Sequence, residues 1–184
     1  MAFFIRTWPM LKRSKPYSSL KPLLRALGAI ASLGLCVYLL HHQGYGLSYQ
    51  VSSSMPKGWY LQRPVVHLQR GDWIFVTPPT FARDYLQKNQ WLPDSGVLLK
   101  SLQGMPGDWV CQKPQALWIN QTIKATLLNR DINQQPIVKQ PFCRRLNSHE
   151  YLVLGISDRR SYDGRYFGPI DRAKILGRAL PLKL

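Results

Sequence analysis

The sequence predicts a mostly β domain that follows one N-terminal transmembrane helix. Two observations carry this prediction: a charge-free apolar run near the N-terminus, and a series of short apolar stretches separated by turn residues in the rest of the chain. With 184 residues, the chain has the length of one domain with a short appendage. Its hydrophobic content of 45% excludes a wholly disordered protein.

The first expected element is the apolar run at 26–40, which has a strongly basic stretch on its N-terminal side. If the run is counted from Pro22, it approaches the roughly 20 residues that a helix needs to cross the hydrocarbon core. A basic flank stays in the cytoplasm, so the rest of the chain is expected outside. We therefore predict a basic cytoplasmic segment at 1–21, a transmembrane anchor at 22–46 and a periplasmic β-rich domain at 47–184.

Two other interpretations of this apolar run stay open. A cleavable signal peptide has the same basic flank, although no clear small-x-small exit follows the run. A buried core helix also produces apolar runs of about 10–14 residues. An uncleaved anchor is preferred, because it accounts together for the basic flank, the apolar run and the tyrosines at 45 and 49.

The charge of the chain indicates its partners. There are 25 Lys and Arg against 9 Asp and Glu, a formal net charge of +16, and the first acidic residue is Asp72. Such an excess indicates an anionic partner, either nucleic acid or a membrane face. Because an anchor is already expected and no helix-turn-helix or base-stacking motif occurs, we expect an anionic lipid surface and no specific nucleic acid.

The external part alternates between strand-like and turn-like sequence. Branched and aromatic residues gather at 59–61, 73–76, 96–100, 108–110, 117–119, 151–154 and 174–176. Residues 117–124 predict a hairpin that turns at Asn120 and Gln121. Residues 81–90 are the best helix candidate here, inserted between strands, and 125–148 are predicted to be irregular.

The cysteines are too few for a fold built from disulfides, and their spacing with histidine predicts no zinc site. We therefore expect no metal and no cofactor. Cys111 and Cys143 both lie outside the membrane in the predicted topology. In an oxidising compartment they are expected to pair, with two buried free thiols as the alternative.

The candidate catalytic residues are a serine and a lysine. Three serines at 52–54 stand directly before Met55-Pro56, a short distance after the predicted anchor. Lys100 follows two leucines at the expected end of a strand and precedes the turn Gly-Met-Pro-Gly-Asp at 104–108. Burial of this lysine would lower its pKa and leave a neutral amine that can act as a base. A serine activated by a lysine is a recognised variant of the catalytic triad.

Four blocks, in this order, resemble those of type I signal peptidases, which are membrane-anchored serine proteases with a Ser–Lys dyad. They lie at 52–56, 70–76, 99–108 and 161–169. The resemblance implies a signal-peptidase-like β-barrel or sandwich as the catalytic domain. It makes Ser54 the nucleophile and Lys100 the general base.

The same resemblance implies the supporting residues. The Ser52 hydroxyl would help to hold the oxyanion together with the backbone N–H of the nucleophile. Ser161 would hydrogen-bond with the lysine amine and fix its direction. Asp163 and Arg165 would form a buried pair beside it, for which a purely structural role is the alternative.

Within this family, the sequence looks closest to the TraF-type peptidases of conjugative transfer systems. The form Ser-Met-Pro-x-Gly-x-Tyr at 54–60, the compact domain and the single anchor carry this likeness. Two departures stand out. Gly164 replaces a common serine, and Ser-Asp-Arg-Arg at 157–160 replaces Gly-Asp-Asn-Arg, which leaves the role of Asp158 open.

The likeness implies an inner-membrane endopeptidase that spans the membrane once, with its N-terminus cytoplasmic. It would remove leader or tail segments from exported precursors. The expected partner is a membrane-inserted, pilin-like precursor, and the product could be closed into a ring by aminolysis. A housekeeping signal peptidase is one alternative. A second alternative is a catalytically silent, membrane-anchored scaffold of a transfer apparatus. The presence of both Ser54 and Lys100 argues against it, because a scaffold needs neither.

Overall fold

The computed structural model describes residues 20–182, which divide into two units between Leu39 and Leu40. Each unit is described by itself. The described part of the first unit belongs to helix α1 (Leu20–His42), whose 23 residues are all exposed. This helix is long and apolar enough to cross a membrane, as the anchor prediction requires. Residues 1–19 of the expected cytoplasmic segment lie outside the described part of the chain.

Helix α1 ends earlier than the predicted boundary of the anchor at 46. The amide of Tyr45 donates to the carbonyl of Leu40, and the amide of Gly44 donates to that of His41. Gly44 has φ +84°, so these two bonds form a Schellman cap, which stops the helix where a left-handed residue is required. Residue 46 therefore opens a strand rather than closing the anchor.

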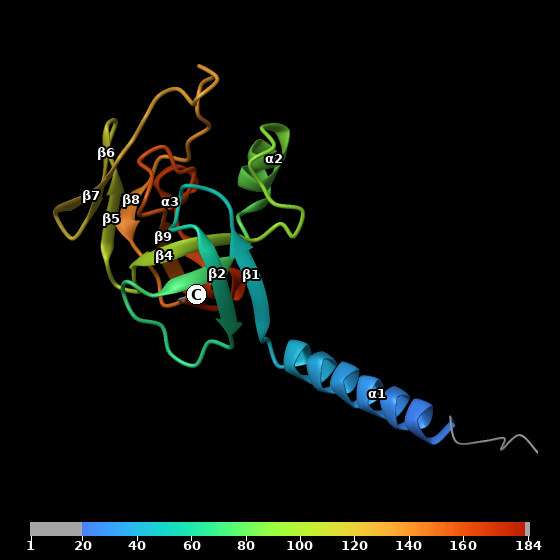
Figure 1. Cartoon of the computed structure of the whole chain (residues 1–184). Helices are drawn as coiled ribbons and strands as arrows, with labels where there is room; N and C mark the ends of the chain where they lie inside the picture. Colours follow the sequence, from blue (N-terminus) through green and yellow to red (C-terminus); the bar gives the residue numbers. More distant parts are fainter. Residues whose placement is uncertain (1–19, 183–184) are drawn as a thin grey trace, which may run out of the picture. The chain divides into compact units, whose positions relative to one another are not determined.

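The second unit contains a seven-stranded antiparallel sheet in the order β1-β2-β11-β3-β4-β9-β10 (Figure 1). Its strands are β1 (Gly46–Gln50), β2 (Gly58–Arg63), β3 (Trp73–Val76), β4 (Leu98–Gly104), β9 (Glu150–Leu154), β10 (Ile170–Asp171) and β11 (Ile175–Pro181). Strand β4 pairs with β3 on one side and with β9 on the other. It therefore lies inside the sheet, with Lys100 opposite Ile74.

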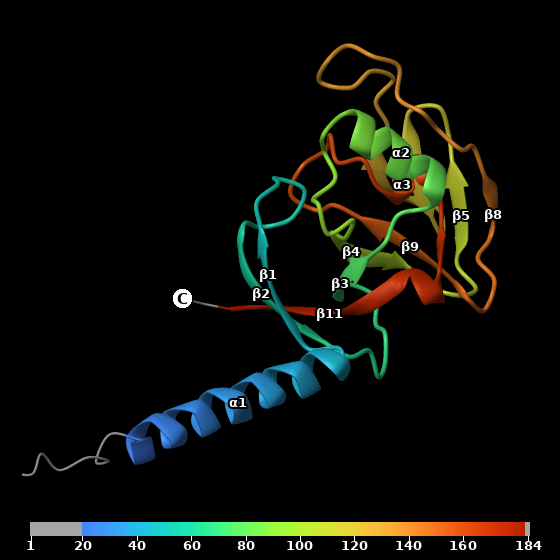
Figure 2. The same cartoon turned by 90° about the vertical axis from the view of Figure 1, so that its right-hand side faces the viewer.

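A smaller antiparallel sheet has the order β7-β6-β5-β8, with strands β5 (Trp109–Gln112), β6 (Ala116–Ile119), β7 (Thr122–Thr126) and β8 (Cys143–Arg145). Figures 1 and 2 show it on the side of the domain away from β1 and β2. The predicted hairpin is confirmed as β6–β7. Asn120 and Gln121 have φ of 47° and 68°, the left-handed conformation that a tight two-residue turn needs.

The predicted disulfide is present. Cys111 and Cys143 lie directly opposite each other in β5 and β8, and their sulfur atoms are bonded. The bond closes a loop across 32 positions of sequence. It attaches the short strand β8 to the hairpin sheet, because β8 has only three residues with which to pair.

Three short helical elements complete the domain: α2 (Thr80–Lys88), α3 (Gly164–Phe167) and the 3-10 turn η1 (Arg172–Lys174). Helix α2 confirms the insertion expected near 81–90, and it buries Ala82 and Leu86 against the core. The helix stops before Gln90, whose φ of 57° is outside helical geometry.

The structure corrects three expectations. Strand β4 does not end at Lys100 but continues to Gly104, because β3 and β9 pair with it beyond the lysine. The region 125–148 is not wholly irregular, since it contains β8. Strand β1 was not expected, although its Leu47 and Tyr49 alternate with Ser48 and Gln50, because the tyrosine at 49 was assigned to the membrane interface.

Candidate active site

The serine segment is fixed by the residue that follows Ser54. The Met55 side chain is 1% exposed and packs in a small core cluster with Tyr60, Phe75, Leu99 and Ala179. The Tyr60 hydroxyl also donates to the carbonyl of Pro56 at 2.7 Å. Core packing of Met55 and the bond to the Pro56 carbonyl therefore fix the Met-Pro pair. Ser54, which is half-buried, lies directly before this pair.

The hydroxyl of Ser54 lies among polar neighbours of its own segment. Its oxygen is 3.0 Å from the Ser52 hydroxyl, and either group can donate. The Gln50 side-chain amide donates to the Ser52 oxygen at 2.7 Å. The three side chains thus form a short hydrogen-bonded row that leads from the end of β1 to Ser54.

Lys100 is buried, as predicted, and is 3% exposed in the middle strand β4. Its Nζ donates to the Ser161 hydroxyl at 2.8 Å. Burial lowers the pKa of Lys100 to about 8, with the nearby Asp163 opposing this shift and Arg165 adding to it. A lysine with this pKa is partly neutral near physiological pH and can accept a proton.

The serine and the lysine line the same cavity, which has a volume of about 850 Å³. Within residues 20–182, no hydrogen bond joins Ser54 to Lys100, because their side-chain bonds run to Ser52 and Ser161. The structure therefore brings the two predicted residues into one site without a hydrogen bond between them. Many apo active sites have loose geometry of this kind, which tightens when substrate binds.

The buried pair of Asp163 and Arg165 is present at the start of α3. Arg165 Nε donates to Asp163 Oδ1 at 2.8 Å, and Nη2 donates to Oδ2 at 3.0 Å. The side chains are 0% and 3% exposed, respectively. The fork geometry pairs the two buried charges with each other, so neither is left without a partner.

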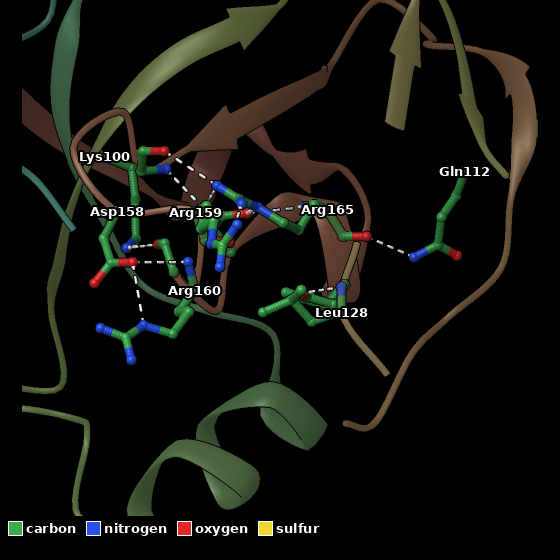
Figure 3. Close-up of polar contacts among 11 residues, drawn as sticks. Lys100, Gln112, Leu128, Asp158, Arg159, Arg160 and Arg165 are labelled. Atoms are coloured by element: carbon green, nitrogen blue, oxygen red, sulfur yellow. Dashed lines mark hydrogen bonds and ion pairs between the residues drawn. The ribbon is translucent and has the colours of Figure 1, made fainter. Parts of the chain in front are cut away.

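This pair also holds the loop between β9 and α3. The amide of Gly155 donates to Asp163 at 2.7 Å, and the Arg165 guanidinium donates to the carbonyls of Arg159 and Gly155 (Figure 3). Figure 3 also shows the carbonyl of Arg165 accepting from Gln112 of β5. The loop, the ion pair and the smaller sheet are therefore connected.

Gly155 is a site residue that the sequence did not single out. A Cβ atom there would lie 2.7 Å from the Cβ of Ser161 and 2.9 Å from the carbonyl oxygen of Ser54. Only glycine lets the chain pass this close to both segments. The position of this glycine directly after an apolar strand could have indicated a close backbone approach. The sequence pattern does not identify the segments that approach it.

Gly164 has a comparable steric reason, which explains one departure from the family pattern. A Cβ atom at this position would lie 2.6 Å from the carbonyl oxygen of Val153. A serine has no room here without a backbone shift. The glycine therefore lets α3 pack closely against β9 at the position where the resemblance led us to expect a serine.

Replacing Gly164 with serine is expected to lower the free energy of unfolding by about 1–3 kcal/mol, because the new Cβ overpacks a backbone contact. Urea denaturation of the purified domain in detergent measures this loss. Gly46→Ser is the matched control, since a Cβ there meets its nearest neighbour at 3.7 Å. Equal stability of the two variants would contradict the steric explanation.

The cavity has an outer wall that the sequence did not predict. Leu86 and Trp91 line it from α2 and the segment that follows, and Leu128, Asp131 and other residues line it from the loop between β7 and β8. The two parts of the wall are joined by the Tyr85 hydroxyl, which donates to Asp131 at 3.2 Å. Helix α2 with the segment that follows it, and the loop between β7 and β8, thus enclose the cavity beside Lys100.

The second and third sequence blocks are tied together away from the cavity. Arg70 forms a bidentate ion pair with Asp108, at 2.9 and 2.8 Å. Burial alone would raise the pKa of Asp108, but hydrogen bonds from the Met105 amide, Asn120 and Arg70 hold it below the usual range. The pair fixes the turn that follows the lysine strand.

The fold and these four connected blocks define a signal-peptidase-type β domain. Residues 20–182 match the family described as signal peptidase, peptidase S26, and the chain belongs to this family.

Several relatives are named as conjugal or plasmid transfer proteins. The chain is 30% identical over 148 residues to the conjugal transfer protein TraF of Agrobacterium fabrum, covering 74% of this chain and 82% of that protein. It is 25% identical over 143 residues to a plasmid transfer protein TraF of Escherichia coli, covering 71% and 79%. A probable signal peptidase I-2 of Synechocystis is 30% identical over 83 residues, covering 45% and 36%. A crystal structure of a signal peptidase I from Enterococcus faecalis is 23% identical and covers 62% of this chain and 97% of that chain, with a TM-score of 0.37.

Proposed function

We propose that the chain is a membrane-anchored serine endopeptidase that cuts exported precursors by a Ser54–Lys100 dyad. The observation that carries the proposal is the burial of Lys100 in a cavity that also contains Ser54. A buried lysine with a lowered pKa is costly for a purely structural protein. Membership in the peptidase S26 family supports the same reaction class.

In the proposed mechanism, neutral Lys100 takes the proton of the Ser54 hydroxyl while the serine oxygen attacks the scissile carbonyl. With a pKa of about 8, roughly a tenth of the lysine is neutral at pH 7. The acyl-enzyme forms as the amine of the leaving peptide departs with a proton from the lysine. Attack on the acyl-enzyme by water, with Lys100 again as base, releases the second product and restores Ser54.

The oxyanion would be held by the backbone N–H of Ser54 and by the Ser52 hydroxyl. The hydroxyl already lies 3.0 Å from the Ser54 oxygen and is oriented by Gln50. Loss of one such donor costs about 3–4 kcal/mol of transition-state stabilisation. Ser161 would keep the lysine amine directed into the cavity.

The proposed substrate is the pilin precursor of a conjugative transfer system. The likeness to TraF proteins of conjugal and plasmid transfer supports this choice. The proposed location is the inner membrane, with α1 as a single anchor and the β domain in the periplasm, where the Cys111–Cys143 disulfide is stable. If the amino group of the same precursor replaces water at the acyl-enzyme, a peptide bond forms and the product is a ring.

Replacing Ser54 with alanine tests the proposal. Full-length wild type and variant are reconstituted in vesicles with a candidate pilin precursor, and cleavage is followed by mass spectrometry. We expect the variant to lose cleavage by at least about 10³-fold, because no other group supplies the nucleophile. Ser148→Ala, an exposed serine in the β8–β9 turn, is the matched control and should cleave like wild type.

Two results would decide against the proposal. Processing by Ser54→Ala at the wild-type rate would show that Ser54 is not the nucleophile, and absence of cleavage by folded wild type would favour the silent scaffold. Equal cleavage of pilin and general secretory precursors by wild type would favour a housekeeping signal peptidase.

A further inference from the structure

We infer that Asp158 is a positioning residue that connects the two halves of the proposed active site. Its side chain holds Ser53, the neighbour of the nucleophile, and its backbone holds Ser161, the partner of Lys100. The inference rests on the proposed function, because it concerns the same site. It assigns a role to a residue whose place in this chain's mechanism the sequence left open.

On the nucleophile side, the loop after β9 forms two hydrogen bonds with the serine segment. The Ser53 hydroxyl donates to Asp158 Oδ2 at 2.7 Å, across 105 positions of sequence. The amide of Ser157 donates to the carbonyl of Ser54 at 3.2 Å. The first bond is charge-assisted and therefore among the stronger hydrogen bonds.

On the lysine side, the same residue acts through its backbone. The carbonyl of Asp158 accepts from the amide of Ser161 at 3.1 Å. The Ser161 hydroxyl in turn accepts from Lys100 Nζ at 2.8 Å. A continuous row of contacts thus runs from Ser53 through Asp158 and Ser161 to the lysine amine.

Asp158 is itself fixed in place. Its Oδ1 accepts from the amide of Arg160 at 2.8 Å, and the Arg160 guanidinium lies 3.6 Å away (Figure 3). The Arg160 amide and the Ser53 hydroxyl lower the pKa of this carboxyl, so it is ionised at neutral pH. The Asp158 side chain is 20% exposed, and Ser53 and Arg160 hold it in place.

This arrangement has a kinetic consequence. Ser54 and Lys100 come from segments that share no direct hydrogen bond in the described residues, so their approach depends on what connects those segments. Loss of the Ser53–Asp158 contact would loosen the serine segment next to the nucleophile, although the Ser157–Ser54 bond and the packing of Met55 against Leu99 would remain. Poor alignment of reacting groups lowers kcat and leaves substrate binding nearly unchanged.

The test uses the full-length protein in vesicles with a candidate pilin precursor. Ser53→Ala and Asp158→Ala are each expected to lower kcat by about 10- to 100-fold with little change in KM. The double variant should be no slower than the slower single variant, because both act through one contact. Ser53→Thr, which keeps the hydroxyl, should restore kcat.

Matched controls use groups outside the site. Ser148→Ala is the control for the serine variants. Glu150→Ala is the control for Asp158→Ala, because Glu150 forms a surface ion pair with Arg144 at 2.6 Å. Both controls should keep the wild-type kcat, and thermal melting should show that all variants are folded.

Two outcomes would overturn the inference while the proposed function stands, provided that Ser54→Ala is inactive. In one, Ser53→Ala and Asp158→Ala both keep the wild-type kcat. In the other, Asp158→Asn shifts the pH midpoint of kcat while Ser53→Ala has no effect, which would make Asp158 a charge acting on Lys100 rather than a positioning group. If Ser54→Ala itself cleaves like wild type, the proposed function and this inference are both wrong.

Discussion

Replacing Lys100 with methionine is expected to abolish precursor cleavage and, at pH 7, to make the protein more stable. Removing one member of a catalytic dyad or triad typically lowers kcat by about 10⁴-fold or more. Methionine fills most of the lysine volume, so the buried position between Leu99 and Ser101 stays packed. Cleavage assays in vesicles measure the first effect, and thermal or urea unfolding measures the second.

The stability effect depends on pH, and its sign follows from the pKa. Lys100 titrates at about 8 in the folded protein, below the ordinary value of 10.5. The unfolded chain therefore binds more protons between these two pH values, so wild-type stability rises with pH across this window. Below about pH 8 the burial penalty is fully present and amounts to roughly 3 kcal/mol.

Methionine removes this penalty but also removes the hydrogen bond to Ser161, which contributes about 1 kcal/mol. At pH 7 the variant should be more stable than wild type by about 2 kcal/mol. Above pH 10.5 the lysine is neutral in both states, so the variant should be slightly less stable than wild type. A difference that does not change with pH would contradict the lowered pKa.

The pH profile of the wild type tests the same group independently. The rate of cleavage should rise about tenfold per pH unit below pH 8 and level off above it. The rise reports the neutral fraction of Lys100. A flat profile between pH 6 and about 8 would exclude this lysine as the general base.

Replacing Asp163 with alanine is expected to cost about 3–5 kcal/mol of stability, because the change leaves the Arg165 charge buried and unpaired. Arg165 is 3% exposed, and only the two loop carbonyls would remain as its partners. The Gly155 amide would lose its acceptor as well. Urea denaturation measures the loss, and activity should fall with it, because the loop that carries Ser161 loses its bonds to this pair.

A surface pair supplies the control for this prediction. Arg144 and Glu150 form a slightly shorter ion pair, at 2.6 Å, but the arginine is 47% exposed. Glu150→Ala should therefore cost no more than about 1 kcal/mol. The double variant Asp163→Leu with Arg165→Met should recover part of the loss, because it leaves no buried charge. Equal destabilisation by Asp163→Ala and Glu150→Ala would show that burial of the pair contributes nothing.

Local sequence was enough to predict much of this protein. The helix α1, the turn at Asn120 and Gln121 and the burial of Lys100 each depend on neighbouring residues: an apolar run, two residues that tolerate positive φ, and flanking leucines. The catalytic candidates Ser54 and Lys100 were likewise recognisable, because each lies in a short block of characteristic form.

The tertiary structure decided which distant segments meet. Strand β8 pairs with β5 beside the Cys111–Cys143 disulfide. The disulfide was expected from the sequence, but a strand of only three residues, Cys-Arg-Arg, could not be assigned from its own pattern. Gly155 and Gly164 are required by backbone approaches to Ser54 and Val153 that no local pattern reveals. The contact between Ser53 and Asp158 spans 105 positions. The sequence thus determined which catalytic side chains are present and the local structure around them. Packing determined how those side chains lie relative to one another, because strand pairing and steric approach depend on residues far apart in the chain.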